Sequence, residues 1–202
     1  LLALSVAGDD EATPRAATAV ERALRPYTTP DGPMATLGGF ADVLNAVARE
    51  RPGTGVALAL GHGGRDAALN AWREHAEAVH EGVRSAHTGR YDGVFVVRGR
   101  SGRDDAAASA ASNAVDTPGR LATLARLVRD FRSPEPLVVA LGEGVAALAA
   151  TESGAADAAS TLAAEFVSGD GDWLGDATQA VARFDPDAAD ADVIAAVREA
   201  GR

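Results

Sequence analysis

The sequence predicts an α/β fold: a layered mixed sheet with flanking helices, a long linker helix, and then a small α/β domain at the C-terminal end. In several stretches apolar residues recur three and four positions apart, the spacing that places them on one face of a helix. Short apolar runs bounded by glycine or proline have the length of buried strands. Helical and strand-like stretches alternate along the chain, and this alternation is typical of layered α/β folds.

The first part of the chain is predicted to hold two helices and one strand. Helices are expected over residues 14–25 and 39–49, because each has apolar residues at helical spacing and proline lies at or just past its ends. The apolar run 56–60 lies between two glycines, which favours a buried strand over a helix.

The middle of the chain contains its longest predicted helix, over residues 65–86. Apolar residues recur there every three or four positions, and the opposite face is rich in Arg, Glu and His. A strand is expected over 92–98, where four apolar residues, three of them valine, follow one another. Residues 99–113 are mostly Gly, Ser, Asp and Ala, a composition that predicts a mobile loop or linker.

Beyond this linker the pattern again alternates between helix and strand. It predicts a helix that opens at Thr117-Pro118, strands over 137–141 and 145–150, a helix over 155–166, a strand over 176–184 and a helix over 191–200.

Composition narrows the class of protein. The 202 residues carry a formal net charge of -10, and all 19 basic residues are arginine. Such an acidic surface suits a salt-rich cell interior, where charge repulsion is screened, so a salt-adapted source is expected. The chain has no cysteine, which excludes disulfides and thiolate chemistry, and no apolar run is long enough to span a membrane. We therefore expect a cytoplasmic protein without membrane partners. Because the sequence starts at Leu1 in an apolar run, it is expected to be part of a longer chain.

Tests for known chemical motifs predict neither a catalytic residue nor a metal site in this chain. Without lysine no P-loop is possible, and no dinucleotide-binding glycine pattern occurs. His75 and His80 are five residues apart, so they diverge around a helix instead of binding one zinc ion. The acidic loop 170–176 lacks the ligands that a calcium loop requires. The glycines at 61–64 either bind an anion at a helix start or simply form a tight turn.

Two segments carry a resemblance to a known family. The first is FADVLNAVARERPGTGVALALG, residues 40–61. It resembles the archaeal RecJ-like DHH phosphoesterases, in which a Leu-Asn-Ala-x-x-Arg helix closes the catalytic half and is followed by a Pro/Gly turn, an apolar strand and a long linker helix. The residues that match this pattern are Leu44, Asn45, Ala46 and Arg49.

The second segment is TPGRLATLARLVRDFRSPEPLVVALGEG, residues 117–144, which is similar to the opening of the DHH-associated C-terminal domain. Gly119 matches that pattern, and Thr123 takes the place of a serine. A later glycine-histidine loop of the family, which holds the nucleic-acid backbone, corresponds to residues 169–176. Gly171 is retained there, but Asp172 replaces the histidine.

The resemblance implies a division of the chain into three parts. Residues 1–63 would be a C-terminal remnant of the DHH catalytic domain, 64–88 the linker helix, and 89–202 the DHH-associated substrate-binding domain. The Asp-His-His motif and the metal-binding aspartates of the family are missing from this sequence. Whether the chain acts as an enzyme therefore stays open, and the manganese or magnesium ions of the family are expected in a parent catalytic domain.

The resemblance also implies a function for the parent protein, namely hydrolysis of single-stranded DNA or RNA from the 5′ end. In this chain it implies a set of nucleic-acid-binding residues: Asn45, Arg49, Gly119, Thr123, Gly171 and Asp172. Two alternatives from the same superfamily remain: a non-catalytic replisome scaffold that binds the GINS complex, and a phosphoesterase for short oligonucleotides or cyclic dinucleotides.

Overall fold

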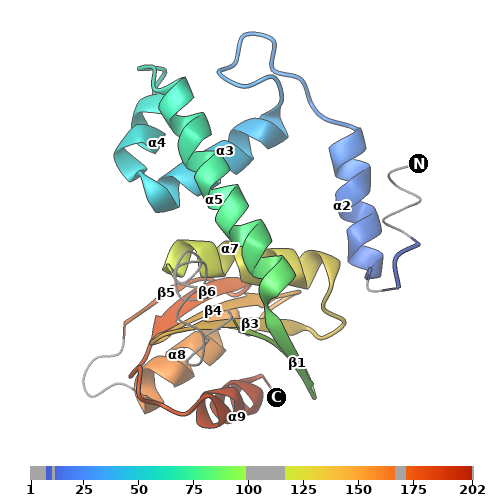
Figure 1. Ribbon diagram of the computed structural model, residues 1–202, viewed down its shortest axis with the longest axis vertical. Helices are drawn as coiled ribbons and strands as arrows, with labels where there is room; N and C mark the ends of the chain where they lie inside the picture. Colours follow the sequence, from blue (N-terminus) through green and yellow to red (C-terminus); the bar gives the residue numbers. More distant parts are fainter. Residues whose placement is uncertain (1–7, 11, 99–116, 167–171, 202) are drawn as a thin grey trace. The chain divides into compact units, whose positions relative to one another are not determined.

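The computed structural model describes residues 8–10, 12–98, 117–166 and 172–201 (Figure 1). The chain divides into two compact units, Leu1–Ala78 and Val79–Arg202. The predicted linker at 99–113 and the predicted site residue Gly171 lie outside the described residues.

The first unit is built from helices. They are α2 (Pro14–Leu24), α3 (Leu37–Glu50), α4 (Pro52–Ala59) and the first part of α5 (Arg65–Ser85). Thr36 caps α3 by accepting a 3.1 Å hydrogen bond from the backbone N–H of Gly39. A small apolar core joins α3, α4 and α5 through Met34, Val43, Val47, Leu58, Ala68 and Ala71. The helices predicted over 14–25, 39–49 and 65–86 are confirmed to within about two residues.

The strand predicted over 56–60 is wrong, because these residues belong to helix α4 and its C-terminal end. Pro52 occupies the first turn of α4, a position where its missing N–H costs nothing, so the Pro-Gly pair begins a helix instead of only ending one. Gly61 (φ 72°) then ends α4: its N–H bonds to the Leu58 carbonyl, and the N–H of His62 bonds to the Ala57 carbonyl. The glycine that suggested the end of a strand is thus a helix cap.

The second unit contains a six-stranded mixed sheet in the order β1-β2-β3-β4-β6-β5. The strands are β1 (His87–Tyr91), β2 (Val94–Arg98), β3 (Leu137–Gly142), β4 (Val145–Ala150), β5 (Trp173–Gly175) and β6 (Gln179–Arg183). Among the strand pairs that the structure describes, only β2–β3 is parallel. Helix α7 (Pro118–Phe131) lies in the connection between these two strands, as a parallel crossover requires.

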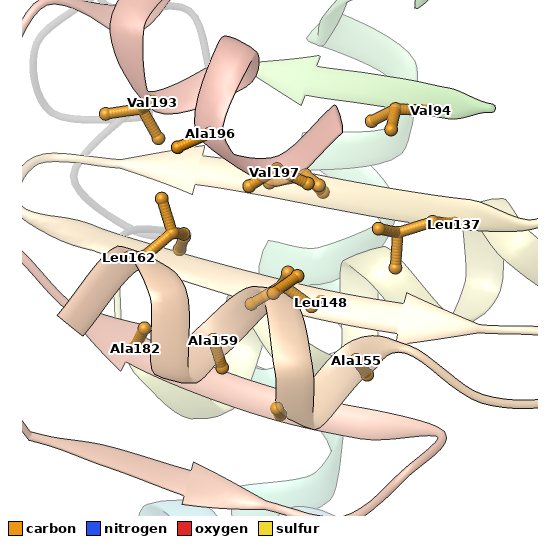
Figure 2. Close-up of a cluster of buried hydrophobic side chains, with 14 of the residues drawn as sticks. Val94, Leu137, Leu148, Ala155, Ala159, Leu162, Ala182, Val193, Ala196 and Val197 are labelled. Atoms are coloured by element: carbon orange, nitrogen blue, oxygen red, sulfur yellow. The ribbon is translucent and has the colours of Figure 1, made fainter. Parts of the chain in front are cut away.

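Helices cover both faces of this sheet. On one face α8 (Ala155–Glu165) and α9 (Asp190–Ala200) pack on alternate residues of β2, β3, β4 and β6 and on Tyr91 of β1, forming the larger core (Figure 2). On the other face α7 buries Leu121, Leu124, Ala125 and Val128 against β3 and β4, and Val79 of α5 joins them. The result is the layered α/β fold with a mixed sheet that the sequence predicts.

Two strands were not predicted, namely β1 and β5. The sequence of β1, HTGRY, has no apolar alternation because the strand forms one edge of the sheet and is mostly exposed. At the other edge β5 is only three residues long, and all three residues are exposed to some degree. Both strands form through pairing with a neighbour, which a single-sequence pattern does not encode. Within the described part of the chain, no helix is both long and apolar enough to cross a membrane.

Candidate functional site

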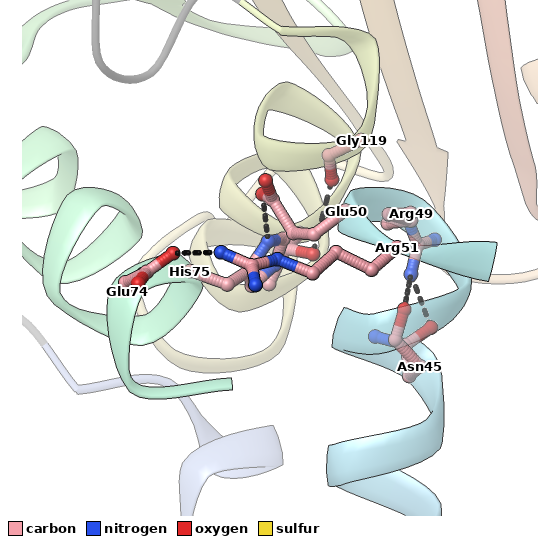
Figure 3. Close-up of polar contacts among 8 residues, drawn as sticks. Asn45, Arg49, Glu50, Arg51, Glu74, His75 and Gly119 are labelled. Carbon is pink, nitrogen blue, oxygen red and sulfur yellow. Dashed lines mark hydrogen bonds and ion pairs between the residues drawn. The ribbon is translucent and has the colours of Figure 1, made fainter. Parts of the chain in front are cut away.

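Asn45 and Arg49 are one turn apart on α3, in the first unit (Figure 3). The Nη1 atom of Arg49 donates to the side-chain oxygen of Asn45 and approaches its backbone carbonyl at 3.5 Å. Both side chains are half-buried. Because the two residues are four apart, the guanidinium of Arg49 is held against its own helix in a defined orientation.

The residues that follow Arg49 connect the end of α3 to α5. Oε1 of Glu50 lies 2.8 Å from Nδ1 of His75, and Nη2 of Arg51 lies 3.2 Å from Oε2 of Glu74 (Figure 3). The Arg51–Glu74 pair is exposed, so it contributes little to stability. Local sequence patterns indicate neither pair, because Glu50 and His75 are 25 residues apart and Arg51 and Glu74 are 23 apart.

Gly119 and Thr123 are one turn apart at the start of α7, in the second unit. The hydroxyl of Thr123 donates a 3.2 Å hydrogen bond to the carbonyl of Gly119 (Figure 3). Thr117 is the N-cap residue, but its side chain makes no capping hydrogen bond. The first-turn N–H groups of a helix attract negative charge, and here no N-cap side chain occupies them.

The topology fixes which end of the sheet this helix start faces. At the C-terminal end of α7, Nη1 of Arg129 donates a 3.0 Å bond to the carbonyl of Ala150, where β4 ends. Helix α7, with 14 residues, is roughly 20 Å long, which is about the length of the neighbouring six-residue strands. The start of α7 must therefore lie toward the opposite end of the sheet, where β4 begins.

Asp172 lies at that same end. Val145, the first residue of β4, pairs with Arg183 of β6. The N–H of Arg183 in turn donates a 2.9 Å bond to the carbonyl of Asp172, directly before β5. Three predicted site residues, Gly119, Thr123 and Asp172, are thus brought to one end of the second unit.

The register also fixes the face to which the β5–β6 edge turns each side chain. Leu174 pairs with Val181, which packs with the α7 core, whereas Trp173 pairs with Ala182, which packs with the α8/α9 core. Side chains alternate along a strand, so Asp172, Leu174, Val181 and Arg183 all lie on the α7 side. On this side Leu174 is 81% exposed. Nε of Arg183 lies 3.7 Å from the carboxylate of Asp172, with both side chains largely exposed.

A tight turn joins β5 to β6. Gly175 has φ 156°, and a Cβ at this position would lie 2.3 Å from the carbonyl oxygen of Gln179, so only glycine fits. Oδ1 of Asp176 accepts hydrogen bonds from the N–H and hydroxyl of Thr178 and from the N–H of Gln179, at 2.7 to 3.0 Å. These bonds hold the pKa of Asp176 below its ordinary value, and the bond from the Thr178 backbone has the largest effect.

Charge separates the two helical layers of the second unit. Helix α7 with its C-cap residue carries four arginines against one aspartate. Helices α8 and α9 together carry five acidic residues against one arginine. In a chain whose net charge is -10, α7 is therefore a local concentration of positive charge. Arg120 and Arg126 lie outside its sheet-facing set and are partly exposed.

The described residues contain no group of three or more His, Asp or Glu side chains that could hold a metal ion. On the α7 side the described residues include a helix start and arginines, which can bind anions, and an exposed leucine at the neighbouring sheet edge. Sequence reasoning missed Leu174 and Arg183, since only the pairing of β5 with β6 places them on the α7 side.

Comparison with known proteins relates this chain to a family. Residues 86–199, more than half of the chain, match the family model described as "Uncharacterized protein rrnAC1427, C-terminal domain". The protein of that name from Haloarcula marismortui is 49% identical over 187 residues, which cover 91% of this chain. The chain spans 44% of the length of that relative.

Among solved structures, the chain is similar to one described as a member of the s1p family of ribosomal proteins, PF0399, DHH domain. The TM-score is 0.45 at 10% sequence identity, over 79% of this chain and 40% of that one. Because more than half of its residues match the family model, the chain belongs to the family of the rrnAC1427 C-terminal domain.

Proposed function

We propose that this chain is the C-terminal nucleic-acid-binding portion of a RecJ-like DHH phosphoesterase, and that the second unit binds single-stranded DNA or RNA along its α7 side. One observation carries the proposal. The start of α7, its arginines and the β5–β6 edge share one side of the sheet, and Gly119 and Asp172 lie at one end of it. Each of these features suits a chain of phosphates and bases.

The start of α7 and its arginines supply the attraction for phosphate. Backbone N–H groups at a helix start favour anions, and arginine side chains bind phosphate oxygens in pairs of hydrogen bonds. Asp172 opposes this attraction, but Arg183 lies beside it and offsets part of its charge. In high salt such long-range charge effects are screened within a few ångströms, so contacts at this short range decide whether a strand binds.

The first unit would contribute Asn45 and Arg49, as the resemblance implies. Arg49 is held by Asn45 in a fixed orientation, which lowers the entropy lost when a guanidinium binds an anion. The segment after it departs from the family pattern, because α4 replaces the expected strand. We therefore assign the main binding surface to the α7 side and not to the first unit.

The chemistry belongs to the parent protein in this proposal. A catalytic domain with two manganese or magnesium ions would cleave the strand from its 5′ end, and the α7 side would hold the strand for it. Active full-length protein should degrade labelled single strands with manganese in molar potassium chloride. If the full-length protein degrades no strand and has an incomplete set of metal-binding residues, the proposed nuclease activity is contradicted.

A second candidate is a non-catalytic scaffold that binds replisome proteins such as GINS. The observation that favours it is Asp172, a carboxylate at the position where the family has a histidine for the strand. A measurement of the affinity of this chain for single-stranded nucleic acid distinguishes the two candidates. A scaffold that no longer binds nucleic acid would show no such affinity. The phosphoesterase for short oligonucleotides would bind a dinucleotide as tightly as a long strand.

The binding proposal is tested by removing two cations from α7. In the variant Arg120→Gln/Arg126→Gln, affinity for a fluorescent single strand should fall at least about tenfold at low salt. The slope of affinity against salt should decrease by about two, because each arginine that contacts a phosphate contributes about one. Fluorescence anisotropy over a series of potassium chloride concentrations measures both quantities.

The control is the variant Arg25→Gln/Arg73→Gln, which makes the same change in net charge in the first unit, at two exposed arginines. It should retain most of the affinity. If both double variants lose affinity equally, net charge and not the α7 side governs binding. Absence of binding by the unmodified chain would contradict the proposed function itself.

A further inference from the structure

We infer that the exposed edge next to α7 is a contact site for an unpaired nucleobase. The site is the β5–β6 ledge, defined by Leu174, Val181 and Arg183 on the α7 side of the sheet. This inference rests on the proposed function and adds to it a contact with the base, which phosphate binding alone does not require.

Leu174 and Val181 form the apolar part of the ledge, and the charged side chains of Asp172 and Arg183 lie beside it. Leu174 is 81% exposed, and its cross-strand partner Val181 is only partly buried. On the other side of the same strand, Trp173 lies 39% exposed beside Ala182 in the α8/α9 layer. The sheet thus ends on its α7 side in an apolar surface that α7, which packs on β3, β4 and β6, leaves open.

The ledge is also held rigidly. The carbonyl of Gln179 packs so closely against Gly175 that no side chain fits there. Three hydrogen bonds to the carboxylate of Asp176 hold the turn that follows. Leu174 cannot turn to the other face, because that would require a one-residue slip of β5 against β6. Because the backbone that carries Leu174 is already ordered, little backbone entropy is lost when a partner covers this side chain.

The charges around the ledge indicate which partner this is. Arg183 and Asp172 both flank Leu174 on this side and offset each other's charge, so the positive charge near the ledge comes from the arginine-rich α7 on the same side of the sheet. A ligand that suits both features carries negative charge next to a flat apolar group. An unpaired nucleotide has this combination, whereas the bases of a duplex are stacked inside and cannot reach Leu174.

The test compares a thymidine strand with an abasic strand of equal length, which keeps the phosphates and sugars but lacks the bases. The unmodified chain should bind the thymidine strand more tightly. The variant Leu174→Ser should bind it about fivefold more weakly and bind the abasic strand unchanged, because only the base contact is lost. Leu60→Ser, which alters a leucine of the first unit that is 64% exposed, should change neither affinity.

Equal affinity of the unmodified chain for the two strands would overturn the inference, as would equal weakening of both by Leu174→Ser. A change of oligomeric state in Leu174→Ser without a base-dependent effect, seen by sedimentation, would also overturn it, since the ledge would then be a contact between copies. These outcomes leave phosphate binding intact. Absence of binding to either strand would instead contradict the proposed function, and circular dichroism verifies that each variant folds.

Discussion

The two faces of the sheet in the second unit are covered in opposite ways. The α8/α9 face has two helices, packed on residues from five strands through alanine and other small or branched side chains, and these helices are acidic on balance. The α7 face is covered by α7, which is basic on balance, and by the C-terminal end of α5, and next to α7 the β5–β6 ledge is exposed.

This difference separates stability from binding. Burial of apolar surface is the main source of folding free energy, so the face with the larger core contributes more of it. The α7 face has a smaller core, and it holds the cations and the exposed leucine that a ligand could contact. The α8/α9 face can therefore supply most of the stability of the sheet, while the arginines of α7 and Leu174 on the other face stay accessible to a ligand.

The largest expected effect is on the stabilising face. Leu162 of α8 is fully buried in the larger core. Leu162→Ala should lower the free energy of unfolding by about 3 kcal/mol, because the lost contacts leave a cavity. Chemical denaturation measures this change. Below the melting temperature of the variant, its affinity for a single strand should stay unchanged; a loss of affinity with the fold intact would mean that the two faces are not separate in function.

A smaller effect is expected at the ledge. Gly175→Ala should cost about 2 kcal/mol of stability, because the new methyl group meets the Gln179 carbonyl and φ at this position disfavours any other residue. The shift of β5 should also move Leu174, so the preference for thymidine over abasic strands should decrease. Gly53→Ala, at a position with open space and ordinary φ, is the matched control. Equal stabilities of the two variants would show that the turn is not tight.

The smallest effect concerns pH. The folded-state pKa of Asp176 is depressed, so its hydrogen bonds stabilise the fold above the pKa of the unfolded state, and this contribution is lost as pH falls through the folded pKa. Asp176→Asn keeps the acceptor oxygen but does not titrate in this range. Below about pH 4 the denaturation midpoint of the unmodified chain should therefore fall more steeply than that of the variant. Parallel curves would show that the turn does not depend on the charge.

Long periodic stretches made most of the fold predictable. Helices α5 and α7 and strands β3 and β4 follow from apolar spacing, because each buries a continuous face. The error at α4 arose where the local signals conflict: a short apolar run between glycines fits a strand, and only Pro52 indicates a helix start. The edge strands β1 and β5 depend on their neighbours and leave little trace in the sequence.

The candidate site was predictable only in part, for a related reason. Gly119 and Thr123 could be placed on a helix from local pattern, and Asn45 and Arg49 at helical spacing likewise. That Asp172 lies at the same end of the sheet as the start of α7 requires the pairing of β4 with β6 and of β6 with β5, together with the bond from Arg129 to Ala150. The exposed side of Leu174 depends on the same register, since a shift of one residue would turn it to the opposite face.

The central claim is that the α7 face binds a single strand and the α8/α9 face does not. Hydrogen exchange of the chain, measured with and without a saturating single strand, tests it most directly. The account predicts slower exchange at the start of α7 and along Asp172–Asp176, with α8 and α9 unchanged. Protection confined to α8 and α9, or to neither face, would contradict it.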